Sequence, residues 1–205
     1  MTLAAPARTV EESLRLVDEW LTTYICRPRP EIPRPGAVCP FVEPAQRAGS
    51  LEIRVRLVGP APSLPLVTEI IRCVLEEFEA NDWRRRTNPA LRALMVTLPD
   101  LPADRLTLLD QAHAAVKDEA VARGLMIGQF HQECAEPSAR NHGFPVSRSP
   151  VPLVVVRRMA LHDVLFLHER ADWFATYASR FGRQLEHARD SADPLFLRLY
   201  DSARG

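Results

Sequence analysis

Apolar residues recur at every second position in some parts of this chain and at every third or fourth position in others. Residues 51–57, LEIRVRL, alternate apolar with charged side chains, a pattern that is typical of a half-buried β-strand. Short apolar stretches at residues 90–98, 125–130 and 152–159 predict three more strands, the last of them rich in β-branched valine. The chain therefore contains enough strand for one small sheet.

Longer amphipathic stretches predict the helices. The first helix begins at Thr9 and Glu12, which have the spacing of a capping box, and it continues to about Ile25. Its apolar face is expected to consist of Val10, Leu14, Val17, Leu21 and Tyr24. Four further helices are predicted over residues 65–82, 101–124, 170–188 and 194–202.

Helices and strands follow one another in the order α-β-α-β-α-β-β-α-α. This order predicts an α+β sandwich, in which helices pack against a small mixed sheet of four strands. A chain of 205 residues, 46% of them hydrophobic, can bury one core but is too short for two ordinary domains. We therefore expect a single domain over residues 1–205.

Two segments lack a clear periodicity. Nine of the 18 prolines fall between residues 28 and 65, and we expect residues 27–48 to lie extended over the surface, because proline removes backbone donors. Residues 131–151 separate the last two predicted strands without an evident helix or strand of their own. A loop of this length in a compact domain is usually functional or disordered, so it is the first place to look for a site.

Charge and cysteine content narrow the class of protein. The chain has 26 lysines and arginines and 26 acidic residues, so no net field gathers nucleic acid or an anionic membrane. The first residues lack the charged and apolar regions typical of a secretion signal, and the sequence has no apolar run of membrane-spanning length. Four widely spaced cysteines, Cys26, Cys39, Cys73 and Cys134, are expected to be reduced thiols, with Cys26 and Cys73 in the core. We therefore expect a cytoplasmic protein, and the sequence leaves a homodimer open.

The loop at residues 131–151 begins with His131, directly after a predicted strand. In the hypothesis that we favour, His131 is the axial ligand of a haem iron, because a strand end holds an imidazole rigidly. Arg140, Arg148 and Arg157 would then pair with the haem propionates. The thiolate of Cys39, next to a proline, is an alternative iron ligand, although its proline-rich segment would hold it less rigidly.

Two other hypotheses use the same residues. Cys39, Cys134, His131 and His142 together offer the thiolate and imidazole ligands of a tetrahedral zinc site. Alternatively, Cys39 is a nucleophile that His131 deprotonates, with an arginine stabilising the oxyanion.

A purely structural interpretation stands beside these hypotheses. His131 could be a hydrogen-bonded structural histidine, and Cys39 and Cys134 could be small buried apolar residues. Arg157 could simply pair with Asp163. In that case the protein has no catalytic role and binds a partner through the same loop, which a structural zinc or thiol site would hold in place.

The cysteine-proline segment, "GLMIGQFH", "NHGFPVSRSPVPLVVVRRM" and "HDVLFL" occur here in the order found in an uncharacterised bacterial domain family common in actinobacteria, which this chain resembles. That family has His-Pro where this chain has His131-Gln132, and Asn-Pro where it has Asn141-His142. More distantly, the chain is similar to YqcI/YcgG-type small haem proteins, which include haem-dependent N-oxygenases. This second resemblance implies haem b with His131 as proximal ligand and N-hydroxylation of a small nitrogenous substrate in specialised metabolism. It further implies an amino acid or guanidino compound as substrate, and an external electron donor.

Overall fold

The structure, a computed structural model, describes residues 9–83 and 88–205. Its main sheet has four strands in the order β1-β2-β6-β3. These strands are β1 (Leu51–Val55), β2 (Ala93–Thr97), β6 (Leu153–Arg158) and β3 (Leu125–Phe130). β1 and β2 are parallel, whereas β6 runs antiparallel to both of its neighbours. The predicted α+β class and the mixed four-stranded sheet are thus confirmed.

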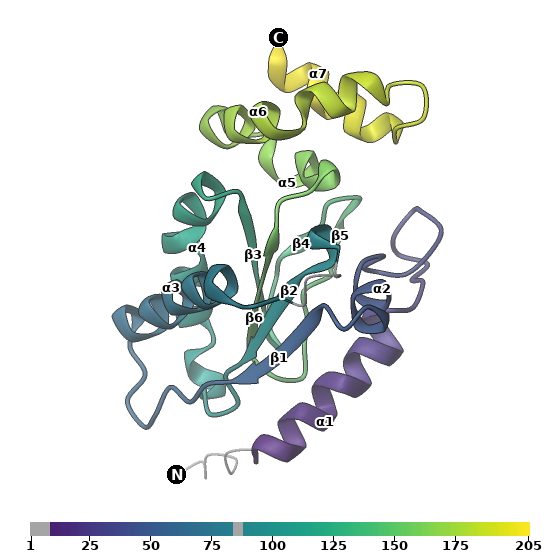
Figure 1. Ribbon diagram of the computed structural model, residues 1–205. Coiled ribbons are helices and arrows are strands. Elements are labelled where there is room, and N and C mark those ends of the chain that lie inside the picture. Colours follow the sequence, from purple (N-terminus) through teal and green to yellow (C-terminus); the bar gives the residue numbers. More distant parts are fainter. Residues whose placement is uncertain (1–8, 84–87) are drawn as a thin grey trace.

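One face of the sheet is covered by α3 (Leu64–Ala80) and α4 (Thr107–Ala122), which lie side by side in Figure 1. The strands contribute alternate residues to this face, because successive side chains of a strand point to opposite sides. The strand residues in this core are Leu94, Val96, Leu125, Ile127, Val154 and Val156. They pack against apolar stripes of the two helices, so this side of the sheet forms the main hydrophobic core.

The opposite face is covered by α1 (Val10–Trp20), a π-helical turn (Leu21–Ile25) and α2 (Val42–Arg47). The Glu12 N–H donates to the Thr9 hydroxyl at 3.1 Å, as the predicted cap requires. The predicted apolar face of α1 is wrong in its first half, because Val10 and Leu14 are exposed.

The buried side of α1 is set by Trp20, a residue that its periodicity did not single out. The Trp20 indole N–H donates to the Arg148 carbonyl at 2.9 Å, and its ring packs edge-on against Phe130. A buried tryptophan with a satisfied N–H contributes more contact area than a valine. Trp20, together with Ser13 and Val17, therefore defines the buried side.

The proline-rich segment differs from the prediction that it is extended. Residues 27–41 form a series of turns, and α2 follows them at Val42–Arg47. Pro44 is compatible with this helix because it lies in the first turn, where backbone N–H groups have no partner within the helix. Ile32 and Ala45 are buried, so the segment packs into the fold instead of lying over it.

Residues 131–151 also contain regular structure that the sequence did not predict. β4 (Pro137–Ser138) pairs antiparallel with β5 (Asn141–Pro145) in a small hairpin. The Tyr24 hydroxyl donates to the Val146 carbonyl at 3.2 Å, and the Asn141 amide donates to the Glu31 carbonyl at 2.7 Å. The hairpin is therefore held by N-terminal segments, and no local sequence pattern reports those contacts.

The C-terminal segment forms a helical layer beyond one end of the sheet (Figure 1). It comprises a 3-10 turn (Leu161–Asp163), α5 (Val164–Leu167), α6 (Ala171–His187) and α7 (Pro194–Arg204). The two longer helices agree with the prediction. No helix in the described ranges is both long and apolar enough to cross a membrane.

Candidate functional site

A cavity of about 550 Å³ lies on the face of the sheet that α1 and α2 cover. Its size is within the range of small-molecule sites, and most of its lining is apolar. The floor is the sheet itself, through the side chains that point away from α3 and α4. These floor residues are Leu51, Ala93, Met95, Met126, Gly128, Phe130 and Val155.

The walls of the cavity come from segments that are far apart in the sequence. Trp20, Leu21 and Ile25 contribute from α1 and the π-helical turn, in which the Cys26 N–H donates to the Leu21 carbonyl at 2.9 Å. Such single π-turns are frequent at functional sites. The remaining wall comes from residues 38–42, the β4–β5 hairpin and aromatic side chains of the C-terminal helices.

Positive charge exceeds negative charge in this lining. Five cationic side chains line the cavity, namely Arg34, Arg92, Lys117, Arg140 and Arg157, against the two carboxylates of Glu136 and Asp193. Arg140 pairs with Asp193, and Arg157 pairs with Asp163. Within the described part of the chain Lys117 forms no ion pair: its ammonium group donates to the Ile127 carbonyl and lies 5.9 Å from the centroid of the Trp173 ring, so no carboxylate neutralises its charge.

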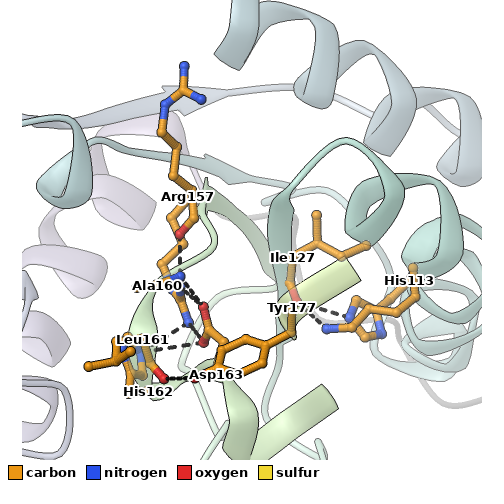
Figure 2. Close-up of polar contacts among 10 residues, drawn as sticks. His113, Ile127, Arg157, Ala160, Leu161, His162, Asp163 and Tyr177 are labelled. Atoms are coloured by element: carbon orange, nitrogen blue, oxygen red, sulfur yellow. Dashed lines mark hydrogen bonds and ion pairs between the residues drawn. The ribbon is translucent and has the colours of Figure 1, made fainter. Parts of the chain in front are cut away.

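Lys117 reaches the cavity from α4, beside the free edge of the sheet. Its Nζ donates to the Ile127 carbonyl at 3.2 Å, and His113 Nε2 lies 3.2 Å from the same oxygen, as Figure 2 shows for His113. β3 is an edge strand, so this carbonyl points toward α4 instead of toward another strand. Burial lowers the pKa of Lys117 to about 8, with Arg157 acting in the same direction and Asp163 opposing it.

Arg157 and Asp163 form a buried ion pair next to the cavity (Figure 2). Arg157 Nη1 and Nη2 donate to the two carboxylate oxygens at 2.7 and 2.5 Å, and the Ala160 N–H donates to the same carboxylate at 2.7 Å. Burial alone would raise the pKa of Asp163, but the Arg157 guanidinium holds it below its ordinary value. The structural interpretation of Arg157 as the partner of Asp163 is thus confirmed.

His162 stands between this ion pair and the cavity. Its Nε2 lies 3.3 Å from Arg157 Nη2, and its ring stacks on Phe41 with the centroids 4.5 Å apart. Burial lowers the pKa of His162 to about 4, and Arg157 adds to the effect while Asp163 opposes it. Burial likewise lowers the pKa of His113 to about 4, so both imidazoles are neutral at pH 7.

His131 does not line the cavity. Met126, Gly128 and Phe130 of β3 face the cavity, so the alternate positions face α4, and His131 continues that second set. It is buried, and its Nε2 lies 3.0 Å from the Asp110 carboxylate on α4. The histidine predicted as a haem ligand therefore points away from the cavity.

Asp110, His131 and Cys134 form a compact polar cluster beside α4. One ligand atom from each of the three lies within 4.8 Å of the others, and His131 and Cys134 are buried. The Gln129 amide donates to the Asp110 carboxylate at 3.4 Å. Cys134 was predicted as a metal ligand with His131, and the structure brings these two together.

The other predicted site residues lie elsewhere. Cys39 lines the cavity, and no hydrogen bond in the described part of the chain joins it to His131. Arg148 is exposed, and it is its backbone carbonyl that contacts Trp20. His142 is exposed in β5, beside a shallow hollow that Arg140 also lines. The zinc set with Cys39 and His142, and the Cys39–His131 nucleophile pair, are thus not assembled.

Sequence reasoning missed the side of α4 that contributes to the cavity and to the Asp110–His131–Cys134 cluster. Asp110, His113 and Lys117 are spaced three and four residues apart, so they share one side of the helix. Three titratable groups on the buried side of an otherwise ordinary amphipathic helix were a detectable signal. The cysteines Cys26 and Cys73, predicted to be in the core, are in fact half-buried free thiols.

Breaking the Arg157–Asp163 pair should destabilise the fold. We expect Arg157→Gln to lower the free energy of unfolding by about 3–5 kcal/mol, because it leaves the Asp163 carboxylate buried without a partner. Arg158→Gln at the neighbouring exposed position is the matched control and should change it by less than about 0.5 kcal/mol. Urea unfolding of both variants measures this, and equal small losses would contradict the assignment.

Acid should destabilise the protein through its buried histidines. Their folded-state pKa of about 4 lies below the ordinary value of 6.5, so the unfolded chain binds more protons between these pH values. The free energy of unfolding is therefore unaffected by these histidines above pH 6.5 and falls as the pH is lowered toward 4. We expect a loss of about 1–3 kcal/mol for each histidine, a range reduced for the solvent contact that both side chains keep. We expect His162→Gln to flatten this dependence of the melting temperature and His142→Gln, at an exposed site, to leave it unchanged. An unaltered slope in His162→Gln would refute the assignment.

Comparison with known proteins gives a family for the chain. No curated protein and no solved structure matches it. A family model matches residues 14–192, a range that includes all four strands of the main sheet, the cavity lining on α4 and the Asp110–His131–Cys134 cluster. Because this match covers most of the sequence, the chain belongs to the family described as Domain of unknown function (DUF6875).

Proposed function

We propose that the protein binds an apolar small molecule carrying a carboxylate, or a comparable anionic group, in the cavity on the α1 side of the sheet. The observation that carries the proposal is Lys117, a cation without a carboxylate partner in the described chain, in the wall of a largely apolar cavity. The apolar floor and walls would receive the body of the ligand. The ammonium group of Lys117 would receive its anion.

Electrostatics support an anion at this position. Burial opposes the charged form of Lys117, so its placement costs folding free energy unless an anion approaches it. A charge-assisted hydrogen bond to a ligand carboxylate would offset this cost and contribute about 1.5–3 kcal/mol to binding.

The charges of the cavity lining also favour some of the substrates implied by the resemblance over others. A carboxylate suits a cavity in which cations outnumber carboxylates, whereas a guanidinium group would face Arg140 and Arg157. Among the substrates implied by the resemblance, we therefore favour an amino acid or another organic acid over a simple guanidino compound. All four cysteines are free thiols, which supports a reducing compartment, the cytoplasm, as the location of the protein.

Replacing Lys117 tests the proposal directly. We expect the wild type to bind octanoate or phenylbutyrate more tightly than the corresponding amides, and Lys117→Met to weaken carboxylate binding about tenfold or more. Binding of the uncharged amides should not change. Isothermal titration calorimetry measures the binding of both ligand types. The proposal is overturned if the wild type binds no apolar acid, or if it binds acids and amides equally tightly.

The stability of Lys117→Met separates a binding role from a structural one. Because burial disfavours the charged lysine, the variant should be about 1–2 kcal/mol more stable than the wild type near neutral pH. His113 still reaches the Ile127 carbonyl in the variant, so that oxygen keeps a partner. A loss of stability together with unchanged ligand binding would mean that Lys117 belongs to the scaffold.

A haem-dependent oxygenase, predicted from the sequence, stays a prediction and is a special case of this proposal. Haem is an apolar ring with two carboxylates, but His131 does not fit as its ligand in this cavity, because it faces Asp110. Cys39 does line the cavity, beside Arg157. If haem is the ligand, the sequence-based alternative of a Cys39 thiolate therefore fits the structure better.

Reconstitution with haemin distinguishes the two iron ligands. If haemin binds in the cavity, we expect Cys39→Ser to alter its Soret band and its ferrous carbon monoxide spectrum, because a thiolate donates more electron density to iron than a hydroxyl. His131→Ala should leave both spectra unchanged. If haemin binds specifically and His131→Ala abolishes that binding, His131 is the iron ligand. If the wild type does not bind haemin specifically, haem is excluded, and the organic-acid proposal is decided by the calorimetry.

A further inference from the structure

The cluster of Asp110, His131 and Cys134 lies outside the cavity and has no part in the proposed ligand site. Its donors are a carboxylate oxygen, an imidazole nitrogen and a thiol sulfur, which together suit a borderline divalent ion such as Zn²⁺. Asp110 lies on α4, His131 directly follows β3, and Cys134 lies in the turn after it. They are therefore brought together by the fold, not by a local motif.

The spacing of the donors is close to what tetrahedral zinc requires. Zinc bonds of about 2.0–2.3 Å imply distances of about 3.3–3.8 Å between neighbouring ligand atoms. The His131 and Asp110 atoms are 3.0 Å apart, and all three donors lie within 4.8 Å of one another. Small side-chain movements would bring them to the distances of a bound ion.

A second observation is the placement of the His131 ring. The residue is 2% exposed, and Nε2, 3.0 Å from the Asp110 carboxylate, is the nitrogen that faces the cluster and would bind the ion. Nδ1 is buried and has no hydrogen-bond partner among the described residues. It would carry the proton of the neutral imidazole once Nε2 binds the ion.

We propose that Asp110, His131 and Cys134 bind a zinc-class divalent cation. Three protein ligands leave a fourth position open, as in zinc sites that bind water or a substrate group. The carboxylate of Asp110 is partly exposed, so an ion can reach the site from solvent while His131 and Cys134 stay buried. The Gln129 amide, which donates to Asp110, would hold that carboxylate in place.

The bound ion would join α4 to the start of the segment that carries the β4–β5 hairpin. The Cys134 and Ser149 N–H groups both donate to the His131 carbonyl at 3.2 Å, so His131 already fixes both ends of this segment. A metal bond to the same residue would tighten the hairpin that forms one wall of the cavity. The sequence-based zinc hypothesis thus keeps His131 and Cys134 and gains Asp110 in place of Cys39 and His142.

Cobalt substitution tests the site, because Co²⁺ reports its ligands by absorption. We expect one equivalent of Co²⁺ to bind to the metal-free protein with a thiolate-to-cobalt charge-transfer band, and Zn²⁺ to displace it. The band should disappear in Cys134→Ser and persist in Cys73→Ser, a half-buried cysteine on α3 that serves as the control. Asp110→Asn, at a partly exposed position, should weaken binding by about a hundredfold or more, since even outer partners contribute about 10–100-fold.

The outcomes separate this inference from the cavity proposal. Zn²⁺ should raise the melting temperature of the wild type but not that of Asp110→Asn, which gives a second measurement should Cys134→Ser fail to fold. Binding without a charge-transfer band, binding that is equally tight in Asp110→Asn, or no stoichiometric binding would each overturn the metal site. Octanoate binding to the wild type and to Lys117→Met is measured on the metal-free protein, so failure of the metal site and failure of the cavity proposal are distinguishable.

Discussion

The buried ion pair between Arg157 and Asp163 connects the sheet to the C-terminal helices. Arg157 lies near the end of β6, and Asp163 ends the 3-10 turn that leads into α5. Two charge-assisted hydrogen bonds join them, and the Ala160 N–H adds a third bond to the carboxylate. The pair thus fixes the path of the chain where it leaves the sheet, and it holds the end wall of the cavity against the floor.

The same pair decides which charges are available in the cavity. The Arg157 guanidinium is bound by Asp163 and Arg140 by Asp193, whereas Lys117 lines the cavity without a carboxylate partner in the described chain. Burial keeps His162 neutral beside the pair, so it adds no further positive charge at pH 7. The cavity is therefore apolar over most of its surface and basic at Lys117, a combination suited to an amphipathic acid.

Two chemically different sites lie on opposite sides of β3. Its side chains alternate, so Gly128 and Phe130 face the cavity whereas Gln129 and His131 face Asp110 on α4. A shift of one residue in the register of this strand would exchange the two sets. This geometry separates His131 from the arginines with which the sequence grouped it. It also explains how one short strand can contribute to both the proposed organic-acid site and the proposed metal site.

Several properties of this protein were determined by its sequence alone. The four strands, the long helices and the Thr9 cap depend on residues within a turn or two of each other, so local patterns predict them. The pairing of Arg157 with Asp163 could be predicted for the same reason, because the two residues are only six positions apart in the sequence. Cysteine and charge content also depend on the sequence alone.

The tertiary structure decided which residues form the cavity and the Asp110–His131–Cys134 cluster. The hairpin is held by contacts such as that between Glu31 and Asn141, 110 residues apart, and Asp110 meets His131 across 21 residues. Such pairs depend on how helices and strands pack, and on which side of a strand a residue falls, neither of which a local pattern encodes. The sequence therefore specified which reactive side chains exist, whereas the packing of α1 and α4 against opposite faces of one sheet determined which of them meet.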